Sequence, residues 1–158
     1  AFASHFAPRL LHEAIALYRQ QFRPSAVLAK PYVMIGVPLI AAPTDAEAEY
    51  LASSMYQRVL GILRGERLRL QPPQENFMAR LHPQERAAIQ DFLAAAVIGS
   101  PETIRRGFAQ LAQSTQADEF ILTCDIYDPA LRLRSLDIAA QVRDEMNGAA
   151  APSAQRAK

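Results

Sequence analysis

The first candidate for chemistry is His5, in the segment Ser4-His5-Phe6 near the start of the chain. Residues 1–6 are short and apolar, which predicts the end of a buried strand. The pKa of histidine lies near neutrality, and a histidine at the carboxyl end of a strand could hydrogen-bond a bound small molecule. The alternative is that His5 caps the turn that follows.

A second group of polar side chains follows a predicted short buried strand over residues 120–124. Cys124, Asp125, Tyr127 and Asp128 stand at its end, where each could line a binding site. For two of them a structural role competes, because Asp128 is typical of a helix N-cap and Cys124 suits a small core position. We assign no catalytic residue, because no serine or cysteine has an evident paired base.

Metal and phosphate sites have weaker support. No histidine pair has metal-ligand spacing, and His12 and His82 fit surface positions, so we expect no metal. The six glycines are scattered, without a glycine-rich phosphate loop. Arginines gather around Glu66 and could attract a phosphate or a dinucleotide, although a solvated loop is the simpler interpretation. These arginines are Arg58, Arg64, Arg67 and Arg69.

Composition narrows the class of protein. The chain has 158 residues, of which 50% are apolar and 21% charged, and a net charge of +1. These values are typical of one globular domain and give no reason to expect binding to nucleic acid or to an anionic membrane. One cysteine excludes an internal disulfide. No apolar run reaches the roughly 18 residues of a membrane helix, and no charged-then-apolar leader opens the chain, so we expect a cytoplasmic protein.

Local signals mark the elements that would position these side chains. Proline at the first turn and helical spacing predict a helix over residues 8–22. The capping box Thr44-Asp45-Ala46-Glu47 predicts a helix over 45–63, and Ser100-Pro101-Glu102 predicts another. Asp128 begins a last helix that ends at Gly148.

The remaining segments are a strand, a loop and a tail. Residues 32–42 are apolar throughout, which is typical of a strand buried on both faces, and Pro38 marks a bulge or an end of regular pairing. Residues 64–82 are polar and arginine-rich and predict a mobile loop, followed by a helix over 83–96. Residues 149–158 predict a disordered tail.

Strands that alternate with helices predict an α/β fold with a parallel sheet. Three strands are few for such a sheet and leave two open edges. We therefore expect either pairing with another copy of the chain or further strands upstream of Ala1. Residues 43–99 form one long insertion, and insertions of this length in compact domains are usually lids or binding elements.

Several segments, in this order and at these spacings, resemble the C-terminal portion of the luciferase-like, flavin-dependent monooxygenases, the bacterial luciferase family. Residues 118–123 (DEFILT), followed by Tyr127-Asp128, resemble the last strand of the family and its exit. The resemblance covers nearly the whole chain except the tail. The other segments are FASHFAP at 2–8, YVMIGV at 32–37, AAPTDAEA at 41–48 and IGSPETI at 98–104.

The resemblance implies a fold and a domain plan. Residues 1–148 would be the C-terminal part, about strands six to eight, of a luciferase-like (β/α)8 TIM barrel. Residues 43–99 would be a lid-like insertion. Members of the family are commonly dimers, so we expect either a homo-oligomer or a partner in the missing N-terminal half.

The resemblance also implies a cofactor and its neighbours. Reduced FMN would lie across the mouth of the barrel, where the strands end, and a deazaflavin stays open as the alternative. Ser4, His5 and Phe6 would bind the flavin, and Cys124, Asp125 and Tyr127 would line the mouth beside the substrate. The loops that hold the flavin phosphate follow the fourth and fifth strands, which this chain lacks.

Two functional hypotheses follow. In the first, the chain is part of a monooxygenase that uses reduced FMN and O2 on a small organic substrate such as an aldehyde, and the part alone is incomplete for catalysis. In the second, it is a catalytically silent half-barrel that acts as a homo-oligomeric binding or structural module. The chain begins inside an apolar segment without methionine, which favours a piece of a longer protein, or processing after synthesis. A complete small α/β domain of unrelated function is a third interpretation.

Overall fold

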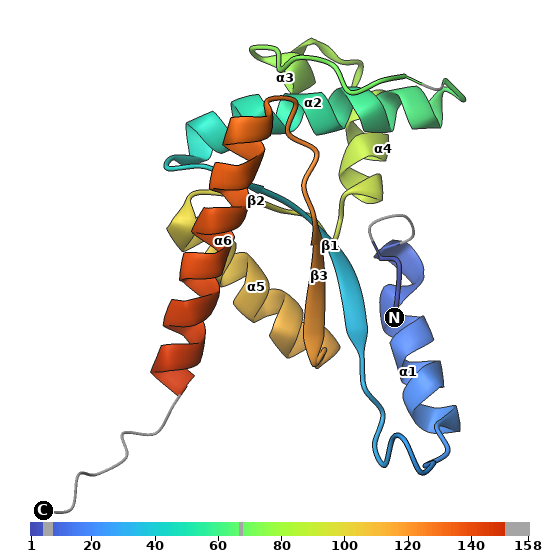
Figure 1. The fold of residues 1–158 in the computed structure, drawn as a ribbon. Coiled ribbons are helices and arrows are strands. Elements are labelled where there is room, and N and C mark those ends of the chain that lie inside the picture. The colour runs from blue at the N-terminus through green and yellow to red at the C-terminus, as the bar shows by residue number, and fades with distance from the viewer. Residues whose placement is uncertain (5–7, 67, 151–158) are drawn as a thin grey trace, which may run out of the picture.

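The computed structural model describes residues 1–4, 8–66 and 68–150. A 3-10 helix precedes α1, and six helices and three strands follow one another in the described residues (Figure 1). Their bounds are η1 Pro8–Leu10, α1 Leu11–Gln21, β1 Met34–Ala41, α2 Asp45–Leu63, α3 Phe77–Arg80, α4 Pro83–Phe92, β2 Val97–Gly99, α5 Pro101–Thr115, β3 Glu119–Thr123 and α6 Pro129–Ala150. None of these helices is long and apolar enough to cross a membrane.

The three strands form one parallel sheet in the order β2-β1-β3. Strand β1 is central, and its first half pairs with β3 from Met34 opposite Glu119 to Pro38 opposite Thr123. Its last three residues pair with β2, an element that the sequence did not predict. Of the predicted strand over residues 1–6, Phe2 forms an isolated parallel bridge with Ile35, and residues 5–7 lie outside the described residues.

Along the edge of β1 opposite β3, the neighbouring segment changes from the Phe2 bridge to β2, and Pro38 lies at this change. The main-chain nitrogen of Gly36 donates to Phe2 O (2.9 Å), and that of Ala42 donates to Gly99 O (3.2 Å). Because alternate residues of a strand direct their main-chain groups to the same edge, the nitrogen of Pro38 faces this edge too. It falls between the Phe2 bridge and β2, where no ladder hydrogen bond requires a donor.

Apolar side chains form two clusters on either side of the central strand. Ile35, Val37 and Leu39 of β1 pack with residues of α1, α5 and α6 in the first cluster. Ile40 packs with residues of α2 and α4 in the second, together with Ile126 from beyond β3. Burial on both faces confirms the interpretation of residues 32–42 as a doubly covered strand.

Most predicted helix starts are confirmed, but at one of them the predicted capping residue makes another hydrogen bond. Thr44 Oγ1 accepts a hydrogen bond from Glu47 N (3.1 Å) at the start of α2, and Asp128 Oδ1 accepts from Ala130 N (2.8 Å) at the start of α6. Ser100 precedes α5 without a side-chain cap, and its Oγ donates to Thr103 Oγ1 instead. The carboxylate of Asp45 accepts from Ser100 N at 2.6 Å, which ties α2 to α5.

The structure differs from the prediction at the ends of two helices and in the burial of one strand. Helix α4 ends at Phe92 rather than near residue 96, because residues 97–99 join the sheet as β2. Helix α6 continues through Gly148 to Ala150, and residues 151–158 of the predicted tail lie outside the described residues. Strand β3 is not buried, since it is an edge strand and Ile121 is 46% exposed.

The arginine-rich segment after α2 is hydrogen-bonded back onto that helix. Ser53 Oγ accepts from Gln74 N (2.7 Å), and Gln57 Nε2 donates to Pro72 O (2.9 Å). Gln74 Nε2 in turn donates to Gln57 Oε1 (2.7 Å). Composition predicted a mobile loop here, but the described part of this segment has specific polar contacts with the face of α2.

Gly99 ends β2 in a conformation that favours glycine, with φ of +152°. A Cβ at this position would lie 2.5 Å from Thr103 Cγ2 and 2.8 Å from Asp45 Oδ1. We expect Gly99→Ala to lower the free energy of unfolding by about 1–3 kcal/mol, measured from the urea midpoint, since backbone strain and overlap act together. Gly65→Ala is the matched control, because Gly65 also has positive φ (+75°) but no atom within 4 Å of its added Cβ. Equal losses in the two variants would contradict the role of packing.

Candidate functional site

The carboxyl end of the sheet brings together several of the residues that the sequence singled out. Parallel strands β1 and β3 end on the same side, and the chain leaves β3 through residues 124–128. Helix α2 lies across this end in Figure 1, with α3 beyond it and α4 beside it. Catalytic and binding residues commonly lie at this end of parallel sheets.

Ser4 has a structural contact along the side of β1 that carries the Phe2 bridge, near the start of that strand. Its side chain is buried, and its Oγ donates a 2.6 Å hydrogen bond to Gly36 O in β1. This bond extends the contact that begins at the Phe2 bridge. The other two residues of the predicted flavin-binding set, His5 and Phe6, lie outside the described residues, so their role stays a prediction.

Cys124 is half-buried directly after β3 and packs against the second apolar cluster. Burial raises the pKa of its thiol, and hydrogen bonds from Ser135 and from the main chain at Ile126 oppose that rise in part. Ser135 itself is fully buried, and its Oγ accepts from Ala41 N at 2.8 Å. A neutral, packed thiol agrees with the small-core-residue interpretation of Cys124.

The raised pKa of Cys124 predicts slow alkylation. At pH 8.5 the folded chain should react with iodoacetamide more slowly than the chain unfolded in urea, because burial raises the pKa of the thiol and the thiolate is the nucleophile. Cys124 is the single cysteine, so mass spectrometry reports on it alone. By the same linkage, its contribution to stability is full below the pKa of an unfolded thiol and is lost as pH rises through the folded value. Equal rates in the two states would contradict this assignment.

Asp125 forms an ion pair with Arg58 of α2, and both side chains are about one-third exposed. The sequence had placed Arg58 in a basic cluster, but the structure does not gather those arginines. Arg64 pairs with Glu85 of α4, and Arg67 lies outside the described residues. A carboxylate at the mouth was predicted, whereas its arginine partner on a distant helix was not.

The rest of the loop after β3 is held by main-chain and apolar contacts. Ile126 is 1% exposed and packs in the second cluster. Its carbonyl oxygen accepts from both Nε (3.0 Å) and Nη2 (2.7 Å) of Arg132 in α6. Tyr127, between Ile126 and the capping Asp128, is 47% exposed. Of the predicted mouth residues, Tyr127 therefore has the side chain most accessible to a ligand.

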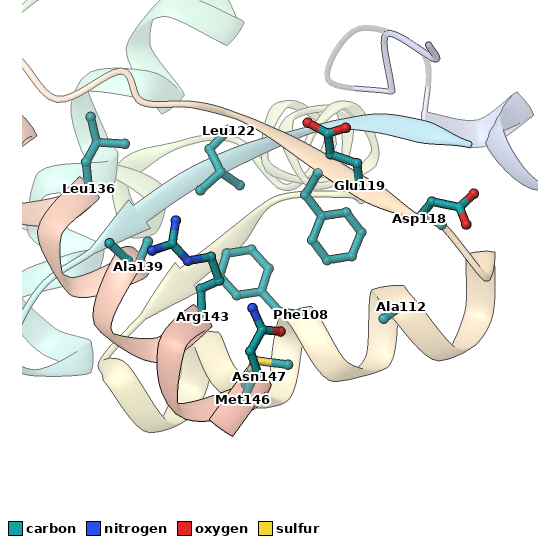
Figure 2. A pocket seen from close by; sticks show the side chains of 13 residues that line it. Phe108, Ala112, Asp118, Glu119, Leu122, Leu136, Ala139, Arg143, Met146 and Asn147 are labelled. Carbon is teal, nitrogen blue, oxygen red and sulfur yellow. The ribbon is translucent and has the colours of Figure 1, made fainter. Parts of the chain in front are cut away.

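A pocket of about 610 Å³ lies elsewhere, between α5, β3 and α6. Figure 2 shows Phe108 of α5, Leu122 of β3 and Leu136 of α6 around it. None of residues 124–128 lines it. Its carboxylates at Asp118 and Glu119 accept hydrogen bonds from Val33 N (2.7 Å) and from the hydroxyl of Tyr32 (3.0 Å). The pocket is thus separate from the predicted mouth, and its two acids bind parts of the same chain.

Within the described ranges, no group of three histidine, cysteine, aspartate or glutamate side chains could hold a metal ion. The two arginines that reach the loop after β3 both have partners, Arg58 in Asp125 and Arg132 in the carbonyl of Ile126. Besides these paired charges, the loop after β3 presents the Tyr127 ring and the Cys124 thiol, which are neutral groups.

Comparison with known proteins identifies relatives of this chain. No protein-family model matches it. It is 39% identical over 148 residues to a luciferase-like monooxygenase of Escherichia coli (strain K12), a match that covers 94% of this chain and 44% of the relative. It is 40% identical over 142 residues to the uncharacterized protein YvbT of Bacillus subtilis (strain 168), covering 90% and 42%. The crystal structure of apo-MsnO8 is similar with a TM-score of 0.70 at 24% identity, covering 90% of this chain and 43% of that one.

These comparisons confirm the resemblance to the luciferase-like monooxygenases and the expected fold class, an α/β chain that forms part of a barrel. The chain spans less than half the length of the relatives that it matches.

Proposed function

We propose that this chain, a relative of the luciferase-like monooxygenases, is the C-terminal part of a flavin-dependent enzyme of that kind. The whole protein would use reduced FMN and O2 to oxidise a small organic substrate such as an aldehyde, in the cytoplasm. The observation that carries the proposal is the 39% identity to a luciferase-like monooxygenase over 94% of this chain. Because the chain spans 44% of that relative, the activity is proposed for the whole barrel and not for this part alone.

The described residues suit one wall of a flavin site. Tyr127 is accessible, and the thiol of Cys124 is kept neutral by burial, so both can face an uncharged ring system. The two arginines that reach the loop after β3 are engaged within the chain, Arg58 with Asp125 and Arg132 with the carbonyl of Ile126. We therefore assign the phosphate contacts to the part of the barrel that this chain does not span.

When bound, the reduced flavin supplies the electrons and the activation of O2, and the protein supplies position and exclusion of water. The chain would contribute to both. Ile126 and the second apolar cluster form a packed base beneath the loop after β3, and α2 covers the end of the sheet. Tyr127 would contact the ligand from this base, and Ser4 would hold the N-terminal segment against β1.

Titration with FMN, oxidised and then dithionite-reduced, tests the proposal through flavin absorbance and fluorescence. We expect no saturable binding by the chain alone at micromolar concentration. We expect saturable binding once the chain is combined with the part of the E. coli relative that it does not span. A folded complex of the two parts that fails to bind either form of FMN would overturn the proposal.

The open edge of β3 supports a second candidate, a silent homo-oligomeric half-barrel. The nitrogen of Glu119 donates to Val33 O, so the main-chain groups of Phe120 and Leu122 face away from β1. Ile121 and the α6 residues Leu133 and Leu136 add exposed apolar surface. An unpaired edge with apolar neighbours favours association of identical chains. Sedimentation of the folded chain as a monomer at micromolar concentration would exclude this candidate.

A further inference from the structure

The loop after β3, residues 124–128, is held from two separate helices. From α6, Arg132 donates two hydrogen bonds to Ile126 O, and the carboxylate of Asp128 caps the helix start. From α2, Arg58 pairs with the side chain of Asp125. Between these contacts the Ile126 side chain is buried in the second apolar cluster, and Tyr127, which is 47% exposed, is the aromatic residue that this stretch presents to solvent.

Arg58 belongs to the expected insertion of residues 43–99, and it forms an ion pair with Asp125 in the loop after β3. It lies in the C-terminal half of α2, and its Nε is buried without a hydrogen-bond partner among the described residues. A buried guanidinium nitrogen has lost its contact with water, so the ion pair with Asp125 is the interaction that compensates this arginine. The fixed planar fork of arginine gives such a pair a defined geometry.

We propose that Arg58 is a positioning residue: its pair with Asp125 fixes the loop of residues 124–128 against α2 and thereby sets where Tyr127 stands at the carboxyl end of the sheet. The insertion would then position the loop that lines the mouth, in addition to covering the mouth. The proposal rests on the proposed function in treating this end of the sheet as the mouth. The contacts that fix the loop are independent of any ligand.

The chain contains no tryptophan, so Tyr127→Trp places a single indole reporter in the loop. In this background we would compare Arg58→Gln, Asp125→Asn, Arg58→Lys and the charge exchange Arg58→Asp with Asp125→Arg. Arg64→Gln is the matched control, because Arg64 terminates the same helix and its ion pair with Glu85 stays inside the insertion. Far-UV circular dichroism and urea midpoints report whether each variant folds.

We expect Arg58→Gln and Asp125→Asn to raise acrylamide quenching of the indole reporter by up to about twofold, since residue 127 is already 47% exposed, and to lower its anisotropy because the loop loses an ion pair. Arg58→Lys keeps the charge and should restore the signal in part, as should the charge exchange. Arg64→Gln should leave the reporter unchanged. Asp125→Asn preserves the volume of the side chain and provides the test if Arg58→Gln does not fold.

Unchanged quenching of the indole reporter in folded Arg58→Gln and Asp125→Asn would overturn the proposal, and so would an equal change in Arg64→Gln. The experiment contains no flavin. A negative result here therefore leaves the FMN titration intact, and a failed FMN titration leaves the role of Arg58 in fixing the loop intact.

Discussion

The chain alone is expected to leave an aliphatic aldehyde unchanged in the presence of reduced FMN and O2, and the chain combined with the rest of a luciferase-like barrel is expected to oxidise it. The net reaction takes aldehyde, reduced FMN and O2 to carboxylic acid, oxidised FMN and water. The physical reason is that the chain spans 44% of the relative, so by the proposed function it would supply only one wall of the site. The measurement is acid formation by mass spectrometry, with reduced FMN supplied anaerobically before air is admitted.

Two controls separate catalysis from the spontaneous reaction of free reduced flavin with O2. Each part alone, and the mixture without protein, set the background of acid formation. The complementing part is the region of the E. coli relative that this chain does not span. A folded complex that binds reduced FMN but forms no acid above background would remove the aldehyde as substrate, while leaving the flavin site in place.

Replacing Ile126 with alanine should lower the free energy of unfolding by about 2–5 kcal/mol, the usual effect of removing a large aliphatic side chain from a packed interior. Ile126 is 1% exposed and belongs to the same cluster as Ile40 of β1 and Met55 of α2. Its loss leaves a cavity where the loop after β3 meets α2, α4 and the sheet. Urea unfolding followed by circular dichroism gives the change, with the slope of the transition as a check on two-state behaviour.

The matched control is Ile121→Ala, which deletes the same atoms from β3 at a side chain that is 46% exposed. Less apolar area returns to water and no closed cavity forms, so the loss should be well below that of Ile126→Ala. A similar loss at both positions would contradict the tight packing of Ile126 in the second apolar cluster.

The elements with strong local signals were predicted well. Thr44 and Asp128 accept hydrogen bonds at the first turns of α2 and α6, as their positions before helical runs indicated. The apolar run that contains β1 is buried on both faces. Such signals are local because a cap or a doubly buried strand is encoded within a few neighbouring residues.

Elements that depend on pairing across the fold were missed. Strand β2 has three residues, too few for a periodic pattern, and exists because it pairs with Leu39–Ala41 along the edge of β1 opposite β3. Burial of β3 was predicted from its apolar residues, but an edge strand has no neighbour on one side among the described residues. Composition also suggested a mobile segment where Ser53 and Gln57 bind the chain after α2.

The site was predicted in its location and not in its contacts. By itself the sequence determined that Cys124, Asp125 and Tyr127 follow a strand, that Asp128 begins a helix, and that the chain resembles the luciferase-like monooxygenases. Only the tertiary structure decided that Asp125 pairs with Arg58, that Ile126 is buried and that Tyr127 is exposed. The physical reason is that capping and burial patterns depend on near neighbours, whereas an ion pair or a packed side chain depends on which distant elements the sheet brings together.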